Sequence, residues 1–378
     1  MNILLLSPGM SKKFNDNYYA YLHMCNLGNN ILVITQRQDI NKSGNTELCL
    51  EYEIDGNFTI HRLFNSIRDQ KSLFKNLVMY SKIKNILFKF QPDIIFCEEL
   101  TNIPLAIKIK HNFKIPIILR VEFPFDIENP YRTMGRLLKY FRTRLTGDYL
   151  PVLIGKTIWR LACKYSDSVI YCYRSNIEKR NDLNRPFFNY VPWPTHHPKI
   201  STRCERIQNR AIFVGSFDRH KNINEFKYTL PLLFQHTPLQ EFWIVGTGED
   251  LNIINTLKDR YPNKIKHIVS LSRHECLELI RTSHFSYSPA VRGGWGFIGD
   301  SWATKTPVVV THNHYDFRDG IDSIVTTPGE IVTSVNILYS QPHIYNSVSF
   351  GGHSRYINNH SSESVGDQYY NICKSVLR

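Results

Sequence analysis

The chain has 378 residues, enough for two domains that each bury a sizeable core, and 42% of its residues are hydrophobic, as in ordinary globular proteins. The net charge of +13 favours an anionic partner, such as nucleic acid, acidic lipid headgroups or a phosphorylated substrate, without choosing among them. No run of about 20 apolar residues is long enough to span a membrane, and the N-terminal apolar run is too short for a signal peptide. The eight cysteines occur singly, without zinc-site spacing. We therefore expect a cytoplasmic protein without a metal site.

Short apolar runs alternate with helical patterns through the first half of the chain. Apolar runs at 3–6 and 31–35 flank a helical pattern at 18–24 that ends at Gly28, and together they predict a βαβ unit. Because strands that alternate with helices form parallel sheets, the continued alternation predicts a doubly wound sheet. Its further elements are strands at 93–96, 116–121 and 168–172 and a helix at 104–111.

Residues 131–165 have a helical pattern in which basic side chains interleave with apolar ones. Such a segment can rest on an anionic membrane surface. It can equally form a helix pair with one core face and one solvated basic face. Both interpretations stay open at this point, so a peripheral contact with the inner face of a membrane is one of our expectations.

The segment 186–198 contains four prolines, which cannot lie inside a helix or a central strand, and we interpret it as the connection between two domains. The alternation then starts again, with a helical tail at 361–378. The pattern predicts an α/β protein with two Rossmann-like domains, whose parallel sheets face each other across a cleft. We expect these domains at 1–192 and 193–355, with a C-terminal helix in 356–378 that packs back on the first domain. The predicted strands of the second half are 211–214, 242–245, 268–271, 285–288 and 308–311.

A glycine-rich stretch runs from Arg292 to Asp300, with four glycines in eight residues. Glycines let the backbone approach a ligand closely, and free N–H groups at a following helix N-terminus favour phosphate or sugar oxygens. Asp300 in the first helical turn can accept hydrogen bonds from two ribose hydroxyls. The alternative is a tight turn that Asp300 caps.

A second candidate segment follows the strand that ends at Gly215. Arg219 and Lys221 lie in one loop at the start of a helix, and two cations beside free N–H groups can clamp a pyrophosphate. The alternative is a pair of solvated surface cations.

The order of these segments resembles the C-terminal domain of GT-B glycosyltransferases of family 4. The resemblance covers about residues 210 to 312 and rests on the collinear stretches VGSFDRHKN, WIVGTGE, LSRHEC, SPA and RGGWGFIGDSWATKTPVVV. It implies transfer of a sugar from a UDP- or GDP-sugar, with retention of configuration and without a metal or other cofactor. The acceptor would be a hydroxyl of a glycan or lipid-linked molecule, as in polysaccharide biosynthesis.

The resemblance also implies roles for single residues. Lys221 matches the family lysine, and Arg219 substitutes for the family arginine, whose place Ser216 takes. The second acidic residue of the family motif falls on Asp300, and the first falls on Arg292 or Gly293. The predicted donor-binding residues are Gly9, Ser216, Arg219, Lys221, Arg292, Gly293, Gly294, Trp295, Gly296, Phe297 and Asp300.

The family's catalytic histidine falls on Glu122. We predict that this carboxylate stabilises positive charge at the anomeric carbon or positions the acceptor. The alternative is an ion pair with Arg120 or a nearby lysine.

Three other functions remain as alternatives. A nucleotide-sugar epimerase can have the same architecture, but we find no cluster of acids with a histidine for it. An inactive relative would only bind the nucleotide. A nucleic-acid-binding protein fits the charge, but the sequence has no base-stacking motif, zinc spacing or repeat, so we expect no nucleic-acid partner.

Overall fold

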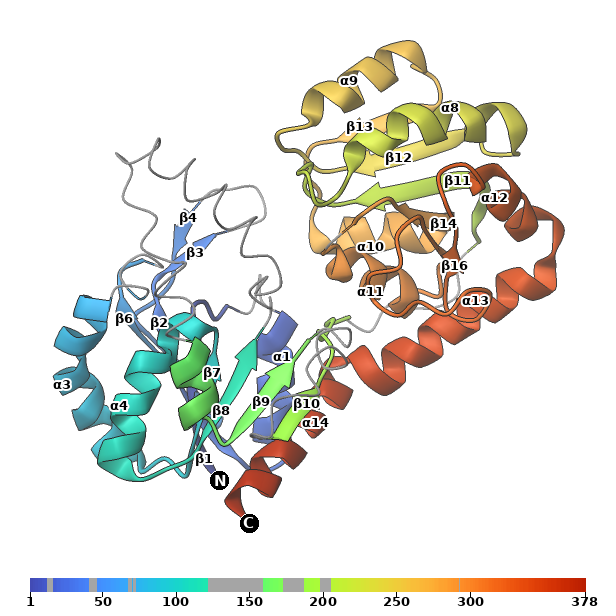
Figure 1. Cartoon of the computed structure of the whole chain (residues 1–378). Helices are drawn as coiled ribbons and strands as arrows, with labels where there is room; N and C mark the ends of the chain where they lie inside the picture. Colours follow the sequence, from blue (N-terminus) through green and yellow to red (C-terminus); the bar gives the residue numbers. More distant parts are fainter. Residues whose placement is uncertain are drawn as a thin grey trace. The chain divides into compact units, whose positions relative to one another are not determined.

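The computed structural model describes residues 1–11, 16–40, 46–66, 70, 73–121, 159–172, 187–197, 205–291 and 293–378 (Figure 1). The chain divides into two compact units. Unit 1 contains Met1–Pro192 together with Val365–Arg378, and unit 2 contains Trp193–Ser364. Glu122, Arg292 and most of the basic segment 131–165 lie outside the described residues.

Unit 1 is built on an eight-stranded sheet with the order β10-β9-β8-β7-β1-β2-β6-β5. Neighbouring strands are parallel except β5 and β6, which pair antiparallel. A separate antiparallel pair is formed by β3 and β4. The strands are β1 (Asn2–Leu6), β2 (Asn30–Gln36), β3 (Gln38–Ile40), β4 (Thr46–Leu48), β5 (Tyr52–Asp55), β6 (Phe58–Phe64), β7 (Ile94–Glu98), β8 (Ile117–Val121), β9 (Ser168–Tyr171) and β10 (Phe187–Tyr190).

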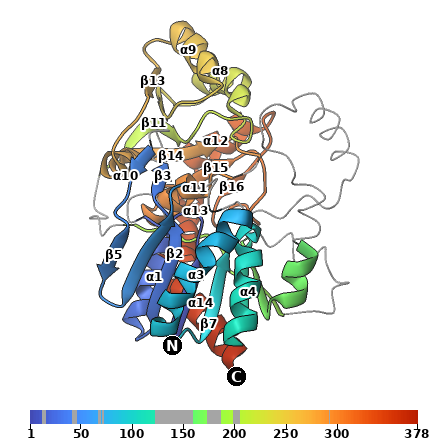
Figure 2. The ribbon, with the colours of Figure 1, turned by 90° about the vertical axis from the view of Figure 1, so that its left-hand side faces the viewer.

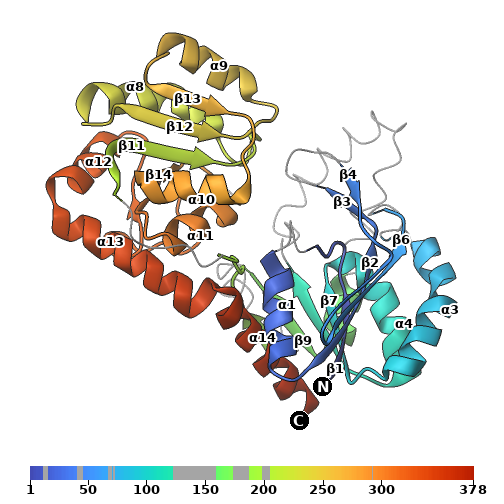
Figure 3. The same cartoon turned by 180° about the vertical axis from the view of Figure 1, so that it is seen from behind.

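Helices cover both faces of this sheet (Figure 3). Successive strand residues point to opposite faces, so Leu4 and Leu6 join the core under one layer while Ile3 and Leu5 join the core under the other. Burial on both faces is the reason that these strands read as continuous apolar runs. The first layer consists of α3 (Leu73–Phe90), α4 (Ile103–Phe113) and the helical residues 159–165, and the second of α1 (Asp16–Asn26) and α14 (Ser362–Leu377).

The C-terminal helix α14 packs directly on α1. The Tyr369 ring stacks on Tyr21 with a centroid distance of 5.5 Å and also meets the Phe96 ring edge-on at 5.1 Å. A Cβ atom on Gly366 would lie 2.6 Å from the Ala20 carbonyl oxygen, so only glycine permits this close approach. The core of unit 1 therefore includes residues from both ends of the chain.

Unit 2 is built on a six-stranded, all-parallel sheet with the order β13-β12-β11-β14-β15-β16. Its strands are β11 (Ile207–Val214), β12 (Glu241–Val245), β13 (Ile265–Ile268), β14 (Ser283–Ser288), β15 (Val308–Val310) and β16 (Ile324–Val325). Its helices are α8 (Phe226–His236), α9 (Leu251–Arg260), α10 (Arg273–Thr282), α11 (Trp295–Ala303), α12 (Ile331–Ser340) and α13 (Pro342–Arg355).

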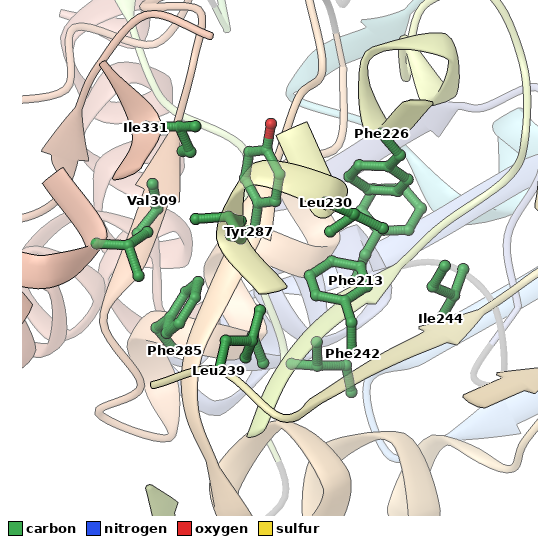
Figure 4. Packing of buried hydrophobic residues seen from close by; sticks show 14 of the residues in the cluster. Phe213, Phe226, Leu230, Leu239, Phe242, Ile244, Phe285, Tyr287, Val309 and Ile331 are labelled. Carbon is green, nitrogen blue, oxygen red and sulfur yellow. The ribbon is translucent and has the colours of Figure 1, made fainter. Parts of the chain in front are cut away.

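Aromatic rings fill the core between this sheet and α8 (Figure 4). Phe226 meets Phe213, Phe242 and Tyr287 at centroid distances of 5.4, 5.3 and 5.4 Å, respectively. Such edge-on and tilted ring contacts add to the stabilisation from burial of apolar area. The packing holds the carboxyl end of β11 in place, where the candidate site begins. No helix in the described ranges is both long and apolar enough to cross a membrane.

Candidate functional site

Three loops of unit 2 meet at the carboxyl ends of the adjacent strands β11, β14 and β15. The loop after β11 contacts the loop after β14, because the Val291 amide donates to the His220 carbonyl at 3.0 Å. The loop after β15 contacts the glycine turn, where His314 Nε2 lies 3.0 Å from the Gly293 carbonyl oxygen. Ligands of parallel α/β sheets bind at this edge.

The loop after β11 is held against the loop after β12 by backbone hydrogen bonds. The amides of Gly215 and Phe217 donate to Val245 and Thr247 at 3.0 and 2.9 Å. A Cβ atom on Gly246 would come within 1.9 Å of the Gly215 carbonyl oxygen. Gly246, which belongs to the stretch WIVGTGE, therefore has a packing role in this structure, because it lets the two loops touch.

A short turn centred on Asp218 presents the following cation. Its carboxylate accepts from Ser216 Oγ at 2.7 Å and from the amides of His220 and Lys221 at 2.8 and 3.2 Å. Burial raises the pKa of Asp218, but these hydrogen bonds and the Lys221 charge outweigh burial and lower it. The ionised carboxylate thus holds the loop together, and the Ser216 hydroxyl is engaged as a donor to Asp218.

Lys221 is the partly buried cation of the site. Burial lowers the pKa of its ammonium group, and the nearby Asp218 carboxylate opposes this effect only in part. Among the residues that the structure describes, its Nζ atom makes no hydrogen bond or ion pair. A Cβ atom on Gly293 would lie 2.9 Å from this Nζ, and one on Gly294 would lie 3.8 Å away. A partly desolvated cation without a hydrogen-bonding partner attracts an anion strongly.

The glycine turn leads into the N-terminus of α11. Gly293 and Gly294 have φ angles of 70° and 87°, in the left-handed region that favours glycine. The first three N–H groups of the helix, from Trp295 to Phe297, have no partner within it, since the first helical bond runs from Ile298 to Gly294. A Cβ atom on Gly296 would meet nothing within 4 Å. This helix end is therefore open and suits an anion.

The side chains of Trp295 and Phe297 anchor this helix end. Trp295 stacks on His360 at 4.0 Å, and Phe297 packs edge-on against Phe213 at 5.6 Å. Both side chains are buried. At these two positions the backbone, rather than the side chain, is the group available to a ligand.

Asp300 forms a bidentate ion pair with Arg273. The two oxygen–nitrogen distances are 2.9 and 2.7 Å, and the same guanidinium also donates to the His196 carbonyl at 2.7 Å. Because α11 begins at Trp295, Asp300 lies in the second helical turn rather than the first. Its contact with a ribose remains a prediction.

Glu225 is a buried carboxylate that was not predicted from the sequence. It accepts from Tyr287 Oη at 2.8 Å, from Thr311 Oγ1 at 2.5 Å and from Asn222 Nδ2 at 2.9 Å. It also pairs with His312 Nε2 at 3.2 Å. Asn222 lies in the loop after β11, Tyr287 is the last but one residue of β14, and Thr311 and His312 follow β15, so Glu225 joins the carboxyl ends of these three strands.

His314 is a second residue that the sequence did not reveal. Its Nδ1 lies 3.0 Å from the His312 carbonyl oxygen, and its Nε2 contacts Gly293. Burial lowers the pKa of His314, the two carbonyl contacts raise it, and the charges of Lys221 and His312 lower it further. The imidazole thus links the loop after β15 to the glycine turn beside Lys221.

Arg219 and Gly9 were also predicted to bind the donor. Arg219 is exposed in the turn before Lys221. Gly9 belongs to unit 1, where its carbonyl accepts from Ser7 Oγ at 2.9 Å. Arg120, the alternative ion-pair partner predicted for Glu122, forms a buried ion pair with Glu98 at 3.2 Å. Within the described residues, no group of three metal-ligating side chains comes together.

No protein-family model matches the chain, and no curated protein matches its sequence. Solved structures are similar over nearly the whole chain. Sucrose-phosphate synthase from Thermosynechococcus elongatus has a TM-score of 0.70 at 14% identity, covering 99% of this chain and 98% of that one. The UDP-forming trehalose-phosphate synthase from Burkholderia vietnamiensis has a TM-score of 0.66 at 12% identity, with 99% and 97% covered. HepE from Anabaena, in complex with UDP, has a TM-score of 0.65 at 11% identity, with 99% and 100% covered.

Proposed function

We propose that this chain, which has the GT-B fold, is a glycosyltransferase that uses a nucleoside diphosphate sugar as its donor. The observation that carries the proposal is the Lys221 ammonium group, which makes no hydrogen bond or ion pair to the described residues and lies against the Gly293–Gly294 turn at the open N-terminus of α11. HepE was solved with UDP, and the trehalose-phosphate synthase is described as UDP-forming. These similarities support a UDP-sugar, and we keep a GDP-sugar as the alternative donor.

The diphosphate of the donor would bind between Lys221 and the first N–H groups of α11. A leaving diphosphate gains negative charge in the transition state, and preorganised donors at that position lower the barrier. Arg219 is exposed nearby in sequence and can add a second cation. Side chains and backbone would thus neutralise the diphosphate, so that no metal is required.

The reaction would retain the configuration of the sugar. The bond between the anomeric carbon and the diphosphate oxygen breaks, and a bond to the acceptor oxygen forms on the same face. The acceptor hydroxyl passes its proton to the departing phosphate oxygen. In this proposal Glu122 stabilises positive charge at the anomeric carbon or positions the acceptor, which would be a glycan or a lipid-linked hydroxyl. A Glu122→Gln enzyme with unchanged turnover would exclude the catalytic role, because glutamine carries no negative charge.

The binding test compares Lys221→Ala with Lys227→Ala, which removes an exposed lysine from α8. Isothermal titration with UDP and GDP measures the affinity of each protein. We expect roughly 10- to 100-fold weaker binding for Lys221→Ala, because a hydrogen bond to a charged group contributes about 1.5–3 kcal/mol. Lys227→Ala should bind as the unaltered protein does. Equal binding by all three proteins would exclude the proposed diphosphate contact.

A panel of UDP- and GDP-sugars then separates an enzyme from an inactive relative. An active transferase releases UDP or GDP from one donor, and faster when its acceptor is present. Conversion of the donor sugar into an epimer without release of nucleotide would instead support the epimerase alternative.

A further inference from the structure

The helical layer of unit 1 formed by α3, α4 and residues 159–165 covers one face of the sheet, and α3 and α4 can be followed in Figure 2. None of the residues assigned to the donor site belongs to this layer. In α3, Tyr80, Ile83 and Leu87 are buried against the sheet. The opposite stripe, at the same helical spacing, is exposed and consists of Val78, Ser81, Lys82, Asn85, Phe88 and Lys89. Such a division gives α3 one core face and one outer face.

This outer side is basic. Neither α3 nor α4 contains an aspartate or glutamate, and residues 100–121 contain none. The charge of Lys110 is neutralised by Asp167, 2.5 Å away, so Lys110 does not belong to the basic face. We define the basic face as Lys82, Lys84, Lys89, Lys108, Lys114, Arg160 and Lys164, all exposed or partly exposed.

Apolar side chains stand exposed among these cations. Val78 is 58% exposed, Phe88 is 55% exposed and Leu161 is 37% exposed. Phe88 contacts Phe113 on α4 at a ring distance of 5.4 Å, and the Lys84 ammonium lies 5.4 Å from its centroid. Phe88 therefore links two of the helices while much of its ring remains open to solvent.

We propose that the basic face binds the surface of an anionic lipid bilayer. Lysine side chains can extend their ammonium groups to lipid headgroups, while Val78, Phe88 and Leu161 enter the boundary between headgroups and acyl chains. A nucleic acid would use the cations but would leave the two aliphatic side chains without a favourable contact, because single strands stack bases on aromatic rings. This inference goes beyond the proposed function, because surface binding needs neither a donor nor turnover.

The test is co-sedimentation of the full chain with two kinds of vesicle. One kind is phosphatidylcholine alone, and the other contains about one third phosphatidylglycerol. We expect binding to the anionic vesicles only, with loss at high salt. The Lys82→Glu/Lys89→Glu protein should bind at least about 30-fold more weakly, since each lysine near an anionic surface contributes roughly fivefold. Phe88→Ala alone should also weaken binding to the anionic vesicles, but it should not change how that binding depends on salt.

The matched control is Lys227→Glu/Lys258→Glu, which places the same change in charge on exposed positions of α8 and α9 in unit 2. It should bind the vesicles as the unaltered protein does. Equal losses in both double variants would overturn the proposal, because binding would then follow net charge alone. Binding to an RNA oligomer, but not to vesicles, that is lost in Lys82→Glu/Lys89→Glu would also overturn it. UDP affinity is measured in every variant, so a failed vesicle test and a failed donor test remain distinct.

Discussion

At the scale of single residues, the candidate site depends on one partly buried cation, the ammonium group of Lys221. Burial disfavours the charged form of Lys221, and the nearest carboxylate, Asp218, is itself engaged by Ser216 and two backbone amides. A bound diphosphate would supply the missing negative charge. The affinity for such a ligand is therefore coupled to the proton on Lys221.

This coupling predicts that diphosphate binding weakens at alkaline pH. The bound anion raises the pKa of Lys221. The contribution of Lys221 to UDP affinity is therefore complete below the lowered pKa that this group has in the free protein, and it declines as the pH rises through that pKa. The affinity for UDP should fall by at most about tenfold per pH unit, and the fall should begin below the ordinary lysine pKa of about 10.4. Isothermal titration of UDP across this range measures it.

Lys221→Arg is the control, because arginine keeps its charge throughout this range. The ionisation of UDP itself is common to both proteins, so the difference between their pH profiles isolates Lys221. Parallel profiles for the two proteins would contradict the coupling.

Single residues also mark the limit of what the sequence predicted about the site. Lys221 and the glycine turn could be found because a loop at a strand end and a run of glycines are local signals. Glu225 and His314 could not, since their partners lie far along the chain, as in the Glu225–Tyr287 and His314–Gly293 contacts. Likewise, nothing local indicated that Asp300 pairs with Arg273.

At the scale of elements, α11 contains two glycines with opposite surroundings. A Cβ atom on Gly296 would meet open space, whereas one on Gly299 would lie 2.1 Å from Thr195 Oγ1. Gly299 is therefore explained by packing inside unit 2. Gly296 has no such explanation in the described residues, and an approaching ligand would account for it.

The two glycines give a matched prediction. Gly296→Ala should keep or raise the thermal stability, because alanine favours a helix by about 0.5–1 kcal/mol over glycine. It should nevertheless weaken UDP binding by tenfold or more, as we expect of a methyl group in front of free N–H groups that bind phosphate. Differential scanning fluorimetry and isothermal titration measure the two effects.

Gly299→Ala should show the reverse, with a lower melting temperature from the contact with Thr195. If Gly296→Ala binds UDP as tightly as the unaltered protein, the N-terminus of α11 does not hold the diphosphate.

Elements buried on both faces were the ones that the sequence predicted well. The alternation of apolar runs indicated β1, β2, β7, β8 and β9 in unit 1, and the predicted α/β class with parallel sheets is confirmed. The prediction for 268–271 was wrong in position, because β13 ends at Ile268 and Ser272 caps α10 in a capping box with Glu275. The strands β5, β6 and β10 of unit 1 were missed, since half-buried or proline-flanked strands lack a continuous apolar run.

At the scale of the whole molecule, the chain leaves unit 1 at Pro192 and returns to it at Val365. The returning helix α14 contributes four fully or nearly fully buried side chains to the core on the α1 side of the sheet, Val365, Tyr369, Ile372 and Cys373. His23 on α1 also pairs with Asp367 at 3.0 Å. Unit 1 is thus built from two separate stretches of sequence.

Ending the chain at Ser364 should therefore destabilise unit 1 selectively. Loss of each large core side chain costs about 2–5 kcal/mol, and several such losses exceed much of the 5–15 kcal/mol that stabilises a typical domain. Hydrogen exchange should show lost protection in the strands of unit 1 and retained protection in the strands of unit 2. Removal of Arg378 alone, an exposed residue, is the control. Full protection of β1 and β2 in the shortened chain would contradict this prediction.

The return of α14 also determines the order in which the protein is completed during translation. Domains generally fold in the order in which the ribosome releases them. Here the strands of unit 1 emerge first, but their second helical layer lacks α14 until all of unit 2 has been made. Unit 2 can therefore finish folding before unit 1, and the nascent unit 1 exposes the apolar surface around Tyr21 and Phe96 until α14 covers it.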